Sequence, residues 1–179
     1  MRLTRKSAEV YLAEGPISML GQDDMQLLRQ GVANSPRGRV RINAHPSDDD
    51  MLHEMFIAIR RDSYIRPHVH PGKSEAFHIV EGVVDIVIFN EDGSVREVVP
   101  LGDVHSGRPF YYRMSQPFFH TLLIHSDILI VHEITNGPFR REGTCFAPFA
   151  PEEGDVDGIA DYRRLLGSQV APFIEGSRS

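Results

Sequence analysis

Three histidines and a glutamate lie close together in YIRPHVHPGKSEAFHIVEG, residues 64–82, and their spacing is typical of a metal site. His68 and His70 are two positions apart, so in an extended strand both imidazoles point to the same side. Pro71-Gly72 predicts a turn, after which Glu75 begins a return strand beside the first. Imidazole and carboxylate donors together suit a divalent transition ion such as Fe, Mn, Ni, Co or Zn.

The alternation of side chains along the return strand decides which of its polar residues face this site. Glu75, Phe77 and Ile79 share one face, so the carboxylate lies on an otherwise apolar wall. A buried carboxylate needs a partner, and a cation would supply one. His78 falls on the opposite face, and we therefore exclude it as a ligand.

A third imidazole has to come from elsewhere, and SQPFFHTLLIHSD, residues 115–127, offers two. His120 shares a strand face with Leu122 and Ile124, so it also points from an apolar wall. His125 lies at a turn and is expected to be exposed. The predicted metal ligands are His68, His70, Glu75 and His120. Four protein donors leave one or two positions for water or substrate on a five- or six-coordinate ion.

Arginines in two segments are candidates for binding the anionic part of a substrate. Arg37, Arg39 and Arg41 alternate and share one face of an extended segment, where they could grip a phosphate or carboxylate. The alternative is a solvated edge that discourages strand pairing. Arg66 shares the face of the ligand histidines and could orient an anion near the metal, or pair with an acid. The catalytic residue is left open, with Arg66 and Glu75 as candidates.

Two further residues have chemistry without a decided role. Glu133 is either a carboxylate that hydrogen-bonds a ligand histidine or an exposed strand residue. Cys145 in GTCFAPF is expected to be a small apolar filler. The sequence shows no nucleophilic triad and no glycine-rich phosphate loop.

The elements that must position these side chains are mostly short strands. The predicted strands cover residues 55–59, 76–80, 83–89, 95–99, 110–113, 121–124 and 128–134. Asp92-Gly93, between two of them, is a strong signal for a hairpin turn. Short strands at close and regular spacing predict an all-β sandwich or barrel.

The chain divides into three parts by pattern. Residues 1–36 are expected to be a partly helical N-terminal segment, 37–150 the β-barrel, and 151–179 a C-terminal extension with a short helix. The apolar residues Met25, Leu28 and Val32 have helical spacing, with Asp23 and Asp24 as possible caps. The C-terminal helix is expected to end at Gly167.

Bulk composition excludes several classes of function. The 179 residues carry a net charge of -6 without a basic stripe, which argues against a nucleic-acid partner. The single cysteine excludes an intramolecular disulfide and a cysteine-based zinc cage. The apolar runs are too short to span a membrane, and the first ten residues lack the apolar core of a secretory signal. We therefore expect a cytoplasmic protein.

The histidine segment resembles the first cupin motif, G-x5-H-x-H-x(3,4)-E-x6-G. The matching residues are His68, His70, Glu75 and Gly82. Asp62 stands where the motif has its leading glycine. The second motif, G-x5-P-x-G-x2-H-x3-N, is degenerate: Ser115 and Pro117 replace its proline and glycine, and Ile124 replaces its asparagine. His120 keeps the histidine, so the resemblance implies that the metal ligands are retained while the turn differs.

A narrower resemblance rests on four segments: SPRGRVRINAH at 35–45, YIRPHVHPGKSEAFHIVEG at 64–82, HEITNGPF at 132–139 and FAPFAPEEGD at 146–155. Together they are similar to the WbuC family of cupin-fold metalloproteins, over residues 34–155. The resemblance implies an all-β fold with a single cupin barrel (double-stranded β-helix, or jelly roll) and short flanking helices. It also implies that Asn43 and His45 line the pocket.

Members of that family are found with bacterial genes for O-antigen and surface polysaccharide. The resemblance therefore implies a metal-dependent enzyme that acts on a carbohydrate or sugar nucleotide in lipopolysaccharide biosynthesis, such as an isomerase or epimerase. Three alternatives stay open: an Fe(II) dioxygenase-type cupin, a non-catalytic metal- or sugar-binding module, and a metal-free cupin with His70 or His120 as general base. By analogy with cupins, the protein is expected to form a homodimer.

Overall fold

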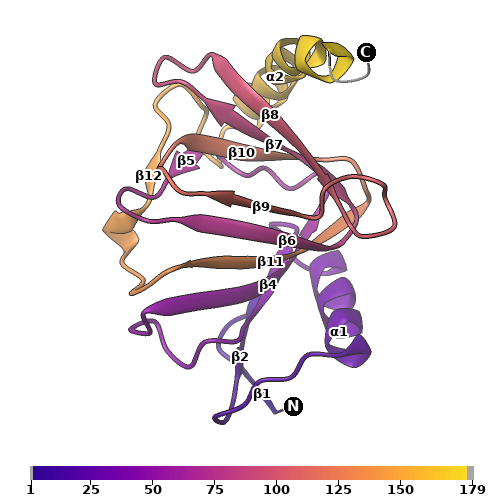
Figure 1. The fold of residues 1–179 in the computed structure, drawn as a ribbon, viewed down its shortest axis with the longest axis vertical. Coiled ribbons are helices and arrows are strands. Elements are labelled where there is room, and N and C mark those ends of the chain that lie inside the picture. The colour runs from indigo at the N-terminus through magenta and orange to yellow at the C-terminus, as the bar shows by residue number, and fades with distance from the viewer. Residues whose placement is uncertain (1, 177–179) are drawn as a thin grey trace.

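The structure, a computed structural model, describes residues 2–176, mostly as two β-sheets with a helix packed outside each (Figure 1). The first sheet contains, in spatial order, β1 (Leu3–Arg5), β2 (Val10–Ala13), β3 (Arg39–Asn43), β4 (Leu52–Arg60), β11 (Ile128–Asn136), β6 (Glu75–Glu81) and β9 (Tyr111–Met114). The second contains β12 (Cys145–Phe146), β5 (His68–Val69), β10 (Phe119–Ile124), β7 (Val83–Phe89) and β8 (Val95–Gly102). The helices are α1 (Gln22–Ala33), α2 (Val156–Gly176) and the short 3-10 helix η1 (Arg141–Gly143).

The chain passes repeatedly from one sheet to the other, as the alternation of β4, β5, β6 and β7 shows. Neighbouring strands are antiparallel, apart from the parallel pair β2 and β3. The described strands form two separate hydrogen-bonded sheets, whereas a closed barrel needs continuous strand pairing around its circumference. The mainly β fold is therefore confirmed, and the expected jelly-roll barrel takes the form of two facing sheets that do not close into one continuous sheet.

The core between the two sheets consists of aliphatic and aromatic side chains from both. Its buried members are Ile59, Phe77, Ile79, Val84, Ile86, Ile88, Leu101, Ile124, Leu129 and Val131. Phe77 and Ile79 belong to the face of β6 that also carries Glu75, as strand alternation predicts. The wall beside the predicted ligands is thus apolar, which keeps bulk water from that part of the interior.

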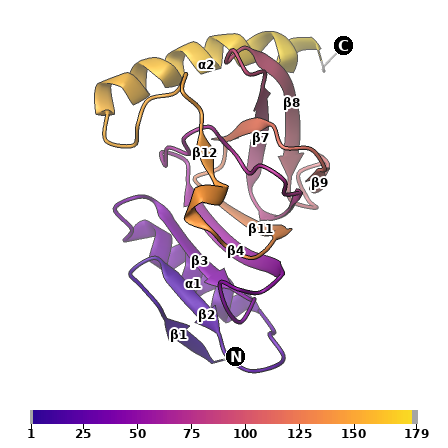
Figure 2. The same cartoon turned by 90° about the vertical axis from the view of Figure 1, so that its left-hand side faces the viewer.

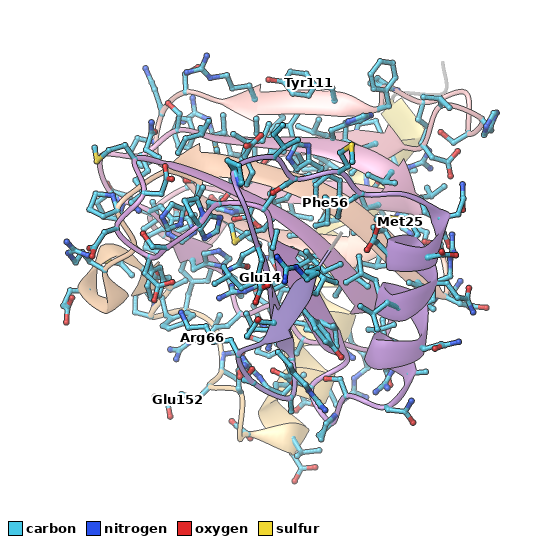
Figure 3. All side chains as sticks on the ribbon, turned by 90° about the horizontal axis from the view of Figure 1, so that it is seen from below. Glu14, Met25, Phe56, Arg66, Tyr111 and Glu152 are labelled. Carbon is cyan, nitrogen blue, oxygen red and sulfur yellow. The ribbon has the colours of Figure 1, made fainter. Side chains whose placement is uncertain are left out.

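Helix α1 covers the outer face of the first sheet over β3 and β4. Its Met25, Leu28 and Val32 are buried there, as their spacing predicts, and Phe56 of β4 lies on the same side (Figure 3). The helix starts after Gly21, whose backbone N–H donates to the Asp24 carboxylate at 2.8 Å. Asp24 therefore stabilises the start of the helix from the third helical position and is not itself the N-cap residue.

Helix α2 lies along the outer face of the second sheet, at the opposite end of the molecule from α1 (Figure 2). The prediction that it ends at Gly167 is wrong, because the helix continues to Gly176. Leu166 and Val170 are both buried against Val87 and Phe89 of β7, and this tertiary packing outweighs the local preference of glycine. No helix among residues 2–176 is long and apolar enough to cross a membrane.

Gly82 joins β6 to β7 with a positive φ of 94°, in a place where a side chain has no room. A Cβ atom there would overlap Ser126 Oγ and lie 2.7 Å from the Ile128 carbonyl oxygen. We expect Gly82→Ala to lower the free energy of unfolding by about 2–4 kcal/mol, the sum of backbone strain and overpacking. Gly72 has a similar φ of 75° but open space, so Gly72→Ala is the matched control and should cost about 1–2 kcal/mol. Chemical denaturation measures both, and equal losses would contradict the steric explanation.

Candidate metal centre

The structure brings the four predicted ligands together from both sheets. His68 on β5 is the cross-strand partner of His120 on β10, so their Cα atoms are direct neighbours. His70 follows β5 directly, and Glu75 is the first residue of β6 in the facing sheet. All four side chains line one cavity. The expectation that Glu75 lies on a strand beside the histidine strand is wrong, because β5 pairs with β10 and β12 whereas β6 pairs with β11 and β9. The grouping therefore depends on how the two sheets face each other and on His120, which is distant in the sequence.

The four side chains are close enough to interact with a common partner. Glu75 Oε1 lies 3.1 Å from His120 Nε2, and Glu75 Oε2 lies 3.7 Å from His70 Nε2. The ring centroid of His68 is 4.9 Å from that of His70 and 4.7 Å from that of His120. Glu75 is 3% exposed and His120 is fully buried, and the Tyr112 hydroxyl donates a long 3.4 Å hydrogen bond to Glu75.

Backbone carbonyl oxygens fix the orientation of all three imidazoles. The Nδ1 atoms of His68 and His120 each contact the carbonyl oxygen two residues earlier, at 2.9 and 3.0 Å. His70 Nδ1 lies 3.3 Å from the Gly143 carbonyl oxygen and 3.2 Å from Thr144 Oγ1. A carbonyl oxygen accepts only from a protonated Nδ1, so we infer that Nε2 is the nitrogen available to a ligand. Metal-bound histidines in proteins are commonly held in this way.

His120 Nε2 provides the test of whether these residues fit a metal ion. It is buried and has no hydrogen-bond partner, because its 3.1 Å approach to Glu75 is too poorly aligned for a hydrogen bond. With Nδ1 protonated, Nε2 must carry either a second proton or a cation to face a carboxylate favourably. The donor set therefore suits a divalent ion. In residues 2–176, no group of three or more His, Cys, Asp or Glu side chains is arranged so that it could hold a metal ion without movement.

The pKa values of the four groups separate them into two kinds. Burial lowers the pKa of His68 to about 4, and burial also lowers the pKa of His70. Burial opposes the charged form of His120, but the adjoining Glu75 carboxylate outweighs it and raises the pKa of His120. Burial acts to raise the pKa of Glu75, whereas His120 and the other imidazoles lower it overall. Without metal, His120 and Glu75 thus form an ion pair beside two neutral imidazoles.

Glu133 is a second carboxyl group near this cluster, on β11. Its pKa is raised to about 8, first by burial and then by the Glu75 carboxylate. It faces the cavity and makes no hydrogen bond to an imidazole among the described residues. Its raised pKa favours the protonated form at neutral pH. A neutral carboxyl group can donate a hydrogen bond to a molecule in the cavity.

Replacing Glu133 by glutamine tests this protonation state. Between about pH 4.5 and 8 the folded protein holds a proton that the unfolded chain has lost, so this group lowers the free energy of unfolding as pH rises. The free energy of unfolding of Glu133→Gln should match that of the wild type near pH 4.5. At pH 8 it should exceed the wild-type value by more than about 1 kcal/mol. Denaturation in chelator across this pH range measures the difference. The exposed Glu97→Gln is the control, and parallel profiles for Glu133→Gln and wild type would refute the raised pKa.

The cavity itself has a volume of about 470 Å³, within the range of small-molecule sites. Around the predicted ligands its walls are apolar, from Ile57, Ile59, Ile65, Phe77, Leu122 and Val131. Away from them it becomes strongly polar, with side chains from β3 and β4. A ligand in the cavity can therefore contact the histidine cluster at one end and polar groups at the other.

The arginines predicted to bind substrate lie at this cavity, and most are already paired. Arg37 and Arg39 contact the Glu153 carboxylate at 3.0 and 2.6 Å, which ties the C-terminal segment to β3. Arg66 lies over the Phe146 ring at 5.1 Å and 3.9 Å from Glu152 at the molecular edge (Figure 3). The alternative of pairing with an acid thus describes Arg66. The alternative of a solvated edge is wrong for the β3 arginines, because β3 pairs with both β2 and β4. Asn43, by contrast, is 2% exposed and faces the cavity.

Three other residues lie where they take no part in the cluster. His78 does not line the cavity, and its ring lies 5.5 Å from that of Phe110. His125 is exposed and pairs with the buried Asp85 at 2.8 Å. The expectation that Cys145 is a buried filler is wrong: it is exposed, because β12 is an edge strand.

Sequence reasoning missed His53 and Lys73, which also line the cavity. His53 near the start of β4 is 4% exposed, and its ring stacks on that of His45 with centroids 4.0 Å apart. Its alternation with Met55 and Ile57, which also face the cavity, is the one signal that could have identified it.

Comparison with known proteins gives distant matches. A family described as a domain of unknown function (DUF6016) matches residues 20–101, which is less than half of the chain. No curated protein matches the sequence. The structure of protein SO0799 from Shewanella oneidensis has a TM-score of 0.54 and 12% identity, over 83% of this chain and 96% of that one.

Two further structures are similar at lower TM-scores. The capsular polysaccharide assembling protein CapF from Staphylococcus aureus has a TM-score of 0.49 and 16% identity, over 63% of this chain and 32% of CapF. Oxalate oxidase in complex with a substrate analogue, glycolate, has a TM-score of 0.48 and 12% identity, over 80% of this chain and 76% of that one. At such identities the likeness shows the fold alone. The chain has a mostly β fold of two facing sheets that is similar to the fold of protein SO0799.

Proposed function

We propose that this protein is a metal-binding cupin and a metal-dependent enzyme that acts on a carbohydrate or sugar nucleotide in bacterial surface-polysaccharide (O-antigen) biosynthesis. The observation that carries the metal part is the buried His120 Nε2, which faces Glu75 without a hydrogen bond, beside His68 and His70. These four residues would hold an ion of Fe, Mn, Ni, Co or Zn. The ion supplies Lewis acidity toward a substrate oxygen when bound.

The remaining cavity residues give the chain its own roles toward a substrate. The apolar walls exclude water around the histidine cluster, which strengthens electrostatic interactions there. Glu133 holds a proton at an atom that faces the cavity, so it can donate a hydrogen bond to a substrate oxygen. Glu75 and Arg66 are the candidates for a direct catalytic part, since both line the cavity.

The carbohydrate part of the proposal is supported by two things. One is the resemblance of four sequence segments to the WbuC family, and the other is a cavity whose size suits a sugar and whose outer part is polar. The proposal includes a homodimer, on analogy with cupins.

The experiment is a conversion assay with protein stripped by chelator and reloaded with one ion at a time. Each form is incubated with a panel of sugars and sugar nucleotides, and NMR spectra follow the sugar signals over time. We expect one ion to support conversion that is absent from the stripped protein and from His68→Ala. If the protein binds a sugar with every ion but converts none, it is a non-catalytic binding module and not an enzyme. Oxygen uptake during the assay would favour a dioxygenase.

A further inference from the structure

The polar end of the cavity holds an arginine without a counter-ion. Arg41 on β3 lines the cavity, its Nε atom is buried without a hydrogen-bond partner, and no ion pair is found for it in residues 2–176. Its neighbours Arg37 and Arg39 are both paired with Glu153. A partly buried guanidinium is costly unless an anion faces it. No described carboxylate forms an ion pair with Arg41, and Glu133 is the acidic group within its electrostatic reach.

Two nearly inaccessible side chains beside Arg41 also lack partners. Asn43 is 2% exposed and His53 is 4% exposed, and neither Asn43 Oδ1 nor His53 Nε2 has a hydrogen-bond partner. Both line the same cavity. His53 is held by its stack on His45, whose Nδ1 contacts the Glu54 backbone at 3.0 Å. Asn43 Oδ1 and His53 Nε2 therefore lack the hydrogen bonds that buried polar atoms normally make, and a ligand in the cavity could supply them.

Strand pairing explains why these three side chains converge. Arg41 and Asn43 are two positions apart on β3 and share a face. Asn43 is paired with Met55 on β4, and His53 is two positions from Met55, so it lies on that same face. The group of Arg41, Asn43 and His53, here called the β3–β4 subsite, is thus built by two adjacent strands of one sheet.

The β3–β4 subsite lies within electrostatic reach of the histidine cluster. Glu133 on β11 is influenced by Glu75 on one side and by Arg41 on the other. Strand β11 pairs with both β4 and β6, so it bridges the subsite and the cluster in the sheet. One small molecule can therefore contact both ends of the cavity.

Acidic groups that might neutralise the subsite are engaged elsewhere. Glu153 is held by Arg37 and Arg39, and Asp48 contacts Lys6 at 2.9 Å. Glu9 accepts a hydrogen bond from Ser35 at 2.8 Å. Glu75 faces His120, and Glu133 interacts with Arg41 at a distance without forming an ion pair with it. An anion from outside is thus the natural partner of Arg41.

We propose that Arg41, Asn43 and His53 bind an acidic, hydroxyl-bearing group of the ligand, so that the substrate is an acidic sugar carrying a carboxylate or a phosphate. Arg41 pairs with the anion, and Asn43 Oδ1 and His53 Nε2 hydrogen-bond to neighbouring hydroxyl groups. This inference rests on the proposed function and narrows its substrate class.

The test measures binding of D-glucuronate, D-glucose 1-phosphate and neutral D-glucose to the full-length protein by calorimetry. We expect at least one of the two acids to bind ten or more times tighter than glucose, and which acid it is distinguishes a carboxylate from a phosphate. In Arg41→Gln, the ratio of the affinity for that acid to the affinity for glucose should fall at least tenfold. The matched control is Arg60→Gln, a strand arginine that is paired with Asp62 and does not line the cavity.

Two results would overturn the inference. One is that neither acid binds wild-type protein more tightly than glucose, a result that needs no variant. The other is that folded Arg41→Gln binds the acids as tightly as wild type. Metal content is measured on the same samples and should be unchanged by Arg41→Gln. Arg41-dependent acid binding in a protein that takes up no metal would remove the proposed metal-dependent function and keep the subsite. Metal uptake by a protein that shows no preference for the acids would keep the proposed metal site and remove the subsite.

Discussion

Replacing His120 by alanine is expected to abolish stoichiometric metal binding and to weaken affinity by more than about 100-fold. Loss of a residue that only orients a metal ligand already lowers metal affinity about 10–100-fold, and His120 is itself proposed as a ligand. It contributes the buried Nε2 that faces Glu75 at 3.1 Å, and no other described imidazole takes its place on β10. Metal titration followed by elemental analysis of the desalted protein measures the loss.

The control for this change is His78→Ala. His78 lies on β6 only three positions after Glu75, but it does not line the cavity. We expect this variant to keep one metal ion per chain. Full retention of metal by His120→Ala, or equal loss by both variants, would contradict the ligand set.

Metal affinity is expected to rise with pH between about pH 5 and 7, by up to about tenfold per pH unit, because the ion displaces the proton of His120. The pKa of His68 is about 4, so this imidazole is neutral in this range, and burial lowers the pKa of His70, which favours its neutral form as well. His120 has a raised pKa and holds a proton that the ion must displace. The pKa of Glu75 is lowered, so its carboxylate is ionised throughout. Acidification toward pH 5 should therefore release the metal.

Calorimetry in buffers with different ionisation enthalpies gives the number of protons released. Affinities at three pH values give the slope. The single proton distinguishes this structure from a site of three ordinary histidines, which would release more protons as pH falls through their common range. A pH-independent affinity would show that His120 is not protonated in the metal-free protein.

The sequence predicted those strands whose signals are local. Val83–Phe89 is an apolar run that ends in the Asp92-Gly93 turn, and β7 has those bounds. The two-residue strand β12 escaped prediction, because it exists only through pairing with β5. The true length of α2 also depends on a distant partner, the outer face of β7.

The same division applies to the site. Strand alternation correctly placed the Glu75 side chain on the face of Phe77 and Ile79, in contact with His120. The pairing of Arg39 with Glu153 could not be foreseen, since the two are brought together by the path of the C-terminal segment. His53 enters the cavity only because β3 pairs with β4, a contact that the sequence does not encode locally.

Anomalous diffraction from crystals of the wild-type protein soaked in the ion that it binds tests the central claim most directly. The account predicts one peak within about 2.0–2.2 Å of the Nε2 atoms of three histidines and of a Glu75 carboxylate oxygen. The histidines are His68, His70 and His120. A peak at other residues, or none in this cavity after soaking, would contradict it.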